Sequence, residues 1–220
     1  MTWRKIIFSR VIICIHSVKC YYTYIMYILV GLGNPGDEYT LTRHNVGRII
    51  LDHIYEEYDF SEWQKDSKAK AIISKGEIDG NEIMLIKPNN FMNNSGGSLE
   101  RFITSKKKLA NTAIIYDDID LPSGSFKISF NRGSGGHRGV ESIIKKMKSK
   151  EFSRIRIGIT PATPKGKLKK PKGEQKVLEY IMGNFKKKEL DDVKKLSKKI
   201  SEAVVVLLKE GPANAMNLYN

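Results

Sequence analysis

Short apolar runs alternate along this chain with segments of helical periodicity. The first run, residues 27–30, leads into the glycine-rich segment 31–47, which reads GLGNPGDEYTLTRHNVG. This order predicts a strand and then a turn at Asn34-Pro35-Gly36. A helix capped by Asn45 is expected next. Its apolar positions recur at helical spacing, at Val46, Ile49, Ile50 and Ile54.

The middle of the chain continues the alternation of strands and helices. Residues 69–77 and 82–86 predict a hairpin that turns at Asp79-Gly80. A helix is expected over about residues 95–103, with Asn94 or Ser95 as its cap.

The last hundred residues add three predicted strands and two predicted helices. The strands are expected at residues 113–116, 125–130 and 155–159, and one helix at 140–147. A C-terminal helix follows from the apolar spacing of Leu190, Val193, Leu196, Ile200, Val204 and Leu207. In a chain of 220 residues, this order predicts a single α/β domain with a mixed, twisted β-sheet flanked by helices.

The charge balance of the chain is strongly basic. There are 38 Lys and Arg residues against 24 Asp and Glu, which gives a formal net charge of +14. Such an excess favours a polyanionic partner such as nucleic acid or, less often, an anionic membrane surface. A lysine-rich proteome would produce the same balance, so charge alone leaves both explanations open.

Residues 1–25 differ in composition from the rest of the chain. They hold basic residues, no acidic residue and both cysteines, Cys14 and Cys20. His16 and Lys19 interrupt their apolar run, which suits neither a secretory signal nor a membrane span. We expect a non-native or dispensable extension over 1–25 and a folded domain over 26–220, with Met26 as its start. A domain without cysteine fits a reducing cytoplasm.

Residues 161–175, PATPKGKLKKPKGEQ, combine three prolines and two glycines with several lysines. This composition predicts an exposed, basic and mobile loop. Such a loop is either a solvated surface excursion or a lid that closes over a phosphate-bearing substrate. Its positive charge favours the lid.

Gly31, Gly33 and Gly36 also match the G-x-G-x-x-G pattern of dinucleotide-binding proteins. In that motif the third glycine lies in a helix that begins at once, and a second parallel strand ends in an acidic residue. Here Pro35 and the polar stretch 37–43 delay the helix, and a hairpin follows it. An NAD-dependent enzyme is therefore the least favoured class.

One histidine and a group of acids are the first candidates for chemistry. His44 lies at a strand-to-helix connection, where a titratable side chain can face a cleft. Asp117, Asp118 and Asp120 follow a predicted strand, although Asp118 and Asp120 also suit loop or helix-cap positions. The sequence has no C-x-x-C and no paired His-Glu spacing, so no metal site is expected.

Four segments, GLGNPGDEYTLTRHNVG, KPNNFMNNSG, YDDIDLPSG and RGSGGHRGVESI, stand in this order between Met26 and the C-terminus. Together they resemble the bacterial-type peptidyl-tRNA hydrolase family, and four co-occurring motifs are far more specific than one. The resemblance covers all but the first 25 residues. It implies hydrolysis, without a cofactor, of the ester between a peptide and the 3′-terminal ribose of tRNA.

The resemblance also implies catalytic roles. His44 matches the general base that takes a proton from the attacking water, and Asp117 matches the carboxylate that orients it. Asn34 and Asn93 match amide donors that would stabilise the oxyanion. The position of Asn34 is further linked to telling a blocked peptide from a free amine. Both asparagines have structural alternatives, Asn34 as a turn former before Pro35 and Asn93 as a helix cap.

A groove for the peptide and the acceptor end of tRNA is implied as well. Arg138 stands where the family usually has asparagine, which puts one substrate contact in doubt, although arginine still donates to phosphate or carbonyl oxygens. Arg156 matches a position that grips the tRNA 5′-phosphate. Its usual basic partner aligns with Ser129, and Lys127 on the same strand face is the expected substitute. The other expected contacts are Tyr39, Phe91, Met92, Asn93, Gly135 and His137. For the two apolar members of this set, core packing is the alternative.

These inferences predict a cytoplasmic, monomeric hydrolase that acts on peptidyl-tRNA and needs no metal, cofactor or membrane. The alternative is a non-catalytic RNA-binding member of the same family, because some members act in RNA splicing and a basic chain with an altered groove can bind RNA without turnover. The joint presence of His44, Asp117, Asn34 and Asn93 favours the enzyme, since an RNA-binding scaffold needs no base with an orienting acid.

Overall fold

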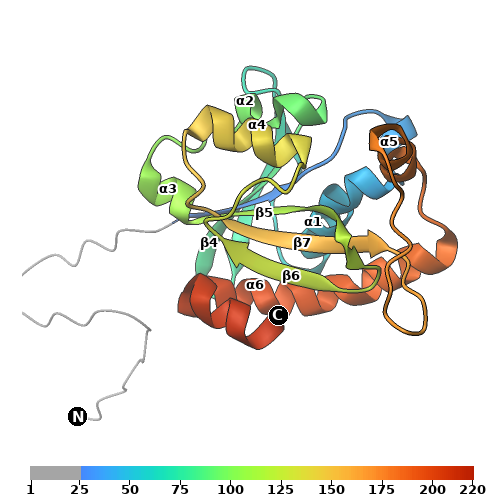
Figure 1. Cartoon of the computed structure of the whole chain (residues 1–220). Coiled ribbons are helices and arrows are strands. Elements are labelled where there is room, and N and C mark those ends of the chain that lie inside the picture. The colour runs from blue at the N-terminus through green and yellow to red at the C-terminus, as the bar shows by residue number, and fades with distance from the viewer. Residues whose placement is uncertain (1–25) are drawn as a thin grey trace, which may run out of the picture.

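A mixed β-sheet forms the centre of the part of the chain that the computed structural model describes, residues 26–220 (Figure 1). Its seven strands lie in the order β2-β3-β4-β1-β5-β7-β6. Residues 1–25, with Cys14, His16 and Cys20, lie outside the described residues. The strands are β1 (Tyr27–Gly31), β2 (Gln64–Asp66), β3 (Ala71–Ile78), β4 (Asn81–Pro88), β5 (Thr112–Pro122), β6 (Phe126–Phe130) and β7 (Ser153–Thr160).

The pairing of the strands confirms the expected mixed sheet. The four central strands, β4, β1, β5 and β7, pair in parallel, whereas the β2–β3, β3–β4 and β6–β7 pairs are antiparallel. Strands β3 and β4 form the predicted hairpin, and Ile78 pairs with Asn81 across the turn at Asp79-Gly80. In a dinucleotide-binding unit the helix leads directly to the second parallel strand, whereas here β2 and β3 come between α1 and β4.

Helices cover both faces of the sheet, and three short 3-10 turns join elements near its carboxyl edge. The turns are η1 (Asp37–Tyr39), η2 (Arg43–Asn45) and η3 (Met92–Asn94). The helices are α1 (Val46–Glu57), α2 (Ser95–Leu99), α3 (Lys106–Ala110), α4 (Arg138–Met147), α5 (Glu174–Met182) and α6 (Lys187–Tyr219). None of the helices within 26–220 combines the length and the apolar character that crossing a bilayer requires.

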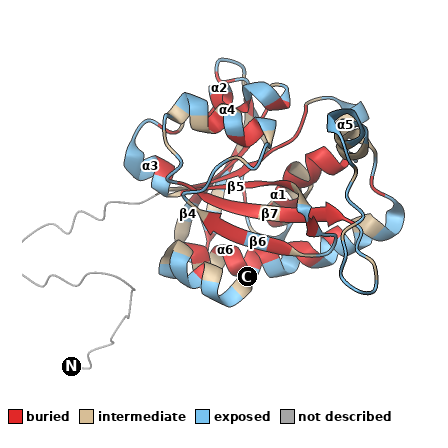
Figure 2. Ribbon diagram, viewed as in Figure 1, coloured by how far each residue is buried: buried red, intermediate tan, exposed pale blue. Residues whose placement is uncertain are grey.

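Two apolar clusters, one on each face, form the core (Figure 2). Because side chains alternate along a strand, Leu29 of β1 joins α1 and α6 on one face, while Ile28 and Val30 join α2, α3 and α4 on the other. Burial on both faces accounts for the continuous apolar run of β1, which differs from the alternating pattern of a half-exposed strand. The single α/β domain expected from the sequence is therefore confirmed.

Several predicted boundaries shift by one or two residues, and three differences change the interpretation of the sequence. β5 continues to Pro122 because it keeps pairing with β7 after β1 has ended, so the acids of this segment lie within the strand and not after it. α2 ends at Leu99, and the predicted helix over 95–103 is too long. The segment 161–173 is largely exposed, as expected, but α5 begins at Glu174, inside the predicted loop.

Helix α1 lies unusually close to the sheet. A Cβ atom on Gly47 would overlap the carbonyl oxygen of Ile115 and the backbone of Leu32, and one on Gly31 would overlap the carbonyl oxygen of Gly47. Only glycine fits at these crossing points. The close approach holds the start of α1, and with it the preceding turn η2, against the ends of β1 and β5.

We therefore expect Gly47→Ala to lower the free energy of unfolding by about 1–3 kcal/mol, because the added methyl group forces backbone apart. Gly97→Ala is the matched control, since a Cβ there meets nothing within 4 Å. In α2 the control should be neutral or slightly stabilising. Urea denaturation of both variants checks this, and equal stability of the two would contradict the packing argument.

Candidate active site

A cavity of about 390 Å³ opens beyond the carboxyl end of β1, where β5 continues paired only with β7. Its walls come from η1, η2, η3, β5, α5 and the loop before α4. The cavity brings together most of the residues expected from the sequence. These are Asn34, Tyr39, His44, Phe91, Met92, Asn93, Asp117, Gly135, His137 and Arg138.

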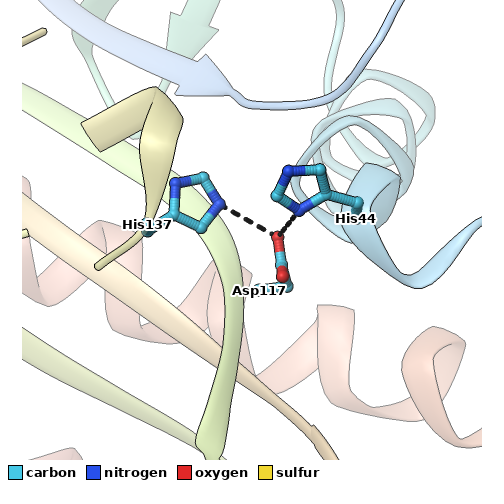
Figure 3. Close-up of side chains that lie close together, drawn as sticks. All are labelled: His44, Asp117 and His137. Carbon is cyan, nitrogen blue, oxygen red and sulfur yellow. Dashed lines mark hydrogen bonds and ion pairs between the residues drawn. The ribbon is translucent and has the colours of Figure 1, made fainter. Parts of the chain in front are cut away.

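His44 and Asp117 meet on one side of this cavity (Figure 3). Nδ1 of His44, on η2, lies 2.8 Å from Oδ1 of Asp117, on β5. Both side chains are buried. Asp117 follows Ile115, the last β5 residue paired with β1, by two positions, and so it lies just past the end of its neighbouring strand.

His137 is a second donor to the same carboxylate oxygen, a contact that the sequence did not predict (Figure 3). Its Nε2 lies 3.1 Å from Oδ1 of Asp117. Its Nδ1 accepts a hydrogen bond of 3.3 Å from the backbone N–H of Val140, at the start of α4. Nδ1 therefore carries no proton, and Nε2–H donates to Asp117. The acceptor role of Asp117 likewise assigns a proton to Nδ1 of His44 and leaves Nε2 of His44 free to accept one.

The surroundings set the protonation states of two groups in this cluster. Burial acts to raise the pKa of Asp117, but the charge and hydrogen bonds of His44 and His137 hold the pKa of that carboxyl well below its usual range. Burial raises the pKa of Tyr116 to about 12. The Tyr116 ring packs on His137, with 4.7 Å between ring centroids. At neutral pH the cluster therefore contains an ionised carboxylate beside a neutral phenol.

Asn34 is held in place by an asparagine that the sequence suggested only as a helix cap. Asn45 makes no capping bond. Its Oδ1 accepts from the backbone N–H of Asn34 at 2.8 Å, and its Nδ2 donates to the carbonyl oxygen of Asn34 at 2.9 Å. Arg48 donates to the same carbonyl at 2.6 Å. A buried asparagine eleven residues later thus binds both backbone groups of Asn34, a pairing that sequence periodicity does not reveal.

The side chain of Asn34 also has a defined orientation. Its Oδ1 accepts from the backbone N–H of Met92 at 2.9 Å, which assigns the oxygen and nitrogen of the amide. Nδ2 then faces the sulfur of Met182, at 3.8 Å. The amide N–H groups of Asn34 consequently have one weak partner and lie on the wall of the cavity.

Helix α5 forms an apolar wall that was not expected from the sequence. Val177, Leu178, Ile181 and Met182 line the cavity, and their helical spacing was the available signal. Phe91, just before η3 and 60% exposed, adds further apolar surface. At the mouth, Arg138 donates to Glu174 of α5 at 2.7 Å, with both side chains exposed.

Arg43 anchors α5 to the turn that carries His44. Its guanidinium donates to the Glu189 carboxylate at 3.0 and 3.2 Å and to the carbonyl oxygen of Gly183 at 3.2 Å. It also lies over the ring of Tyr180, with 4.6 Å from Cζ to the ring centroid. The residue before His44 therefore fixes the end of α5 and the start of α6.

Arg156 and Lys127 do not line the cavity. They are cross-strand partners on β7 and β6, and Arg156 donates to Oδ2 of Asp118 at 2.7 Å. Asp120 pairs with Lys170. The suggestion that Asp118 and Asp120 are loop or helix-cap acids is therefore wrong: both belong to β5, and each pairs with a cation.

The three ligand atoms of His44, Asp117 and His137 lie within 4.8 Å of one another, the spacing of a potential metal site within residues 26–220. Metal binding would require unprotonated nitrogens on both imidazoles. The hydrogen bond from Val140 to His137 instead directs a proton on His137 toward Asp117. The donor set thus fits a hydrogen-bonded network better than a metal centre.

The cluster has the parts of a general-base site. An imidazole with one free nitrogen is oriented by an ionised carboxylate, and an amide donor lies across a cavity with an apolar wall. Such an arrangement suits the addition of water to an acyl carbon. Fold and site together define an α/β protein built for hydrolytic chemistry.

Comparison with known proteins names the family. Residues 28–220 match the model of the family described as Peptidyl-tRNA hydrolase. Peptidyl-tRNA hydrolases of Solibacter usitatus and Koribacter versatilis are 35% and 39% identical, covering 89% of this chain and 94% and 92% of their own lengths. The crystal structure of peptidyl-tRNA hydrolase from Acinetobacter baumannii superimposes with a TM-score of 0.78 at 28% identity, over 90% of this chain and 95% of that one. The chain belongs to the peptidyl-tRNA hydrolase family.

We expect Asn45→Ala to lower the free energy of unfolding by about 1–3 kcal/mol, because the buried N–H of Asn34 loses its partner. Asn94→Ala is the control, since Asn94 is exposed and its side chain makes no capping bond. Thermal and urea unfolding of the two variants provide the measurement. A loss as large in Asn94→Ala as in Asn45→Ala would show that the Asn34 contacts are not responsible.

Proposed function

We propose that this protein hydrolyses the ester bond of peptidyl-tRNA with His44 as general base and Asp117 as the carboxylate that orients it. The observation that carries the proposal is the 2.8 Å contact between His44 and Asp117 at the wall of the cavity. It leaves Nε2 as the basic atom of His44. Membership of the family supplies the substrate, because the matched relatives are named peptidyl-tRNA hydrolases.

The reaction proceeds by addition of water and loss of the ribose oxygen. Nε2 of His44 takes a proton as the water oxygen bonds to the ester carbon, and the carbonyl oxygen becomes negatively charged. The tetrahedral intermediate then expels the 3′ oxygen of the ribose, which receives the proton from His44. Asp117 stays ionised throughout and stabilises the imidazolium. The products are a peptide with a free carboxyl group and a tRNA with a free 3′ hydroxyl.

Asn34 and Asn93 are the proposed donors to the developing oxyanion. The oxygen of the Asn34 amide is already bonded to Met92, so the Nδ2 group is the part that remains for a substrate. Asn93, exposed on η3, lines the cavity as well. Donors in place before the reaction stabilise charge without reorganising. The Asn34 contact would also distinguish a blocked peptide from a free amine.

The two arms of the substrate would contact different surfaces. Tyr39, Phe91, Met92 and α5 form the mostly apolar wall that suits peptide side chains. Arg138 and the exposed glycine-rich turn that holds Gly135 would bind the terminal nucleotide, through the guanidinium and accessible backbone N–H groups. Arg156, with Lys127 beside it, would contact the 5′-phosphate. The site is complete within one chain, which favours a monomer, and the substrate favours the cytoplasm as its location.

A non-catalytic RNA-binding role is the weaker alternative. Two imidazoles converge on one buried carboxylate, and removing that carboxylate from water is energetically costly. RNA binding alone would not explain this arrangement, whereas general-base catalysis would.

We expect His44→Ala to lower kcat for N-acetyl-aminoacyl-tRNA by about 10²–10⁴-fold, because the general base is removed. His53→Ala, on α1 outside the cavity, is the matched control and should retain full activity. Release of the N-acetyl-amino acid is followed with chelator present, and unblocked aminoacyl-tRNA should be cleaved poorly. No cleavage by folded wild-type protein that binds tRNA would refute the proposed activity.

We expect Asp117→Asn to lower kcat by about 10³–10⁴-fold with little change in KM, because the amide can select the wrong imidazole tautomer. Because the pKa of Asp117 is lowered, its carboxylate should stay ionised in mildly acidic solution, so the ratio of wild-type to Asp117→Asn activity should hold between pH 7 and pH 5. An active Asp117→Asn variant, or a ratio that collapses in this range, would contradict the assignment.

A further inference from the structure

A second hollow, of about 790 Å³, lies over the contact between α2 and α4, on the upper side of the molecule in Figure 1. None of its lining side chains is apolar. Four lysines dominate it, and we call it the basic groove. They are Lys70, Lys145, Lys146 and Lys148.

The groove is built into the packing of the two helices. Gly96 of α2 approaches Ser142 of α4 so closely that a Cβ would overlap its backbone, and the N–H of Gly96 donates to Oγ of Ser142 at 3.0 Å. Lys70 is held at a φ of 51°, with its carbonyl oxygen accepting from the N–H of Asn89 and from Oγ of Ser98, each at 2.7 Å. Fixed backbone therefore sets the positions from which the lysines project.

The charge of the groove is largely uncompensated. Glu100 is its single acid and lies 2.7 Å from Lys146. Across residues 26–220, no salt bridge involves Lys70, Lys145 or Lys148. Lysines in the last turn of α4 also complement its dipole, but Lys70 belongs to a different segment and has no such role.

The groove adjoins the cavity of the proposed active site. Asn93 lines both hollows. In the sheet, Lys70 borders the β3–β4 side, whereas Arg156 and Lys127 lie on β7 and β6, beyond β5. Basic surfaces thus occur on both sides of the cavity that would hold the ester.

We propose that the basic groove binds the phosphodiester backbone of the tRNA substrate near its acceptor end. The proposal rests on the proposed function. Lysine ammonium groups and asparagine amides are donors that suit phosphate and ribose oxygens. The groove has no apolar lining, which argues against peptide side chains as its ligand. An apolar surface for those side chains is present on α5. Peptides also vary in charge, whereas every RNA linkage carries one negative charge.

The test compares two double variants with the same change in charge. Lys145→Glu with Lys148→Glu alters the groove, and Lys194→Glu with Lys198→Glu alters exposed positions on α6, which packs on the opposite face of the sheet. Substrates are N-acetyl-aminoacyl-tRNA and the N-acetyl-aminoacyl ester of adenosine, which has no phosphodiester. Affinity for deacylated tRNA is measured in parallel by fluorescence anisotropy over a range of salt concentrations.

We expect the groove variant to raise KM and Kd for tRNA roughly tenfold at low salt, and to reduce the salt slope of log Kd by about 1 for each phosphate that the groove no longer neutralises. Its kcat and its rate with the adenosine ester should match the wild type. The α6 variant should change little. Equal behaviour of both variants with tRNA would overturn the proposal.

Two other results would also overturn it. If the groove variant lost activity equally with tRNA and with the adenosine ester, the groove lysines would affect the region around the ester and not the tRNA backbone. A defect confined to substrates with acidic peptides would mean that it binds the peptide. If the wild type cleaved neither substrate, the proposed function would fail, while the anisotropy comparison would still decide whether the groove binds RNA.

Discussion

One oxygen atom of Asp117 accepts hydrogen bonds from two imidazoles, and the arrangement of the site depends on this contact (Figure 3). A buried carboxylate is costly unless its charge is satisfied. Here the donors arrive from η2 and from the start of α4, elements almost a hundred residues apart in the chain. Both must pack on the end of β5 for the charge to be tolerated, so the fold and the protonation state of the site support each other.

The turn η2 gives three consecutive residues three separate tasks. Arg43 anchors the chain around α5, His44 meets Asp117, and Asn45 holds the backbone of Asn34. A tight turn points successive side chains in divergent directions, which lets one short segment connect three walls of a cavity. The close approach of Gly47 to Ile115 then fixes this turn against the sheet. Backbone packing therefore helps to set the geometry of the site.

The sequence predicted local features better than long-range contacts. The hairpin around Asp79-Gly80 and the strand before Gly31 follow from turn chemistry and apolar runs, which act over a few residues. The meeting of His44 and Asp117 came only from the resemblance to a family, because spacing along the chain does not encode which elements pack together. For the same reason the bond from His137 to Asp117 was missed.

Other departures have equally physical causes. A strand that loses one neighbouring strand can keep pairing with the other. β5 therefore extends past Asp117, paired with β7, although its apolar run ends there. The side chain of Asn45 makes hydrogen bonds to the backbone N–H and C=O of Asn34, because the two residues are buried side by side. A side chain used in this way is not available to cap the following helix. Helix α5 has a short amphipathic pattern that the basic segment before it obscured.

The ion pair between Arg138 and Glu174 shows how a departure from the family pattern can be accommodated. Both side chains are exposed, and an exposed pair contributes little to stability because water and salt compete with it. Arginine can therefore leave Glu174 for a substrate oxygen at small cost, and its reach exceeds that of the asparagine the family usually has there. The pair also joins α4 to α5 across the mouth of the cavity. A contact this weak would yield to a charged ligand, which makes arginine compatible with the proposed catalysis.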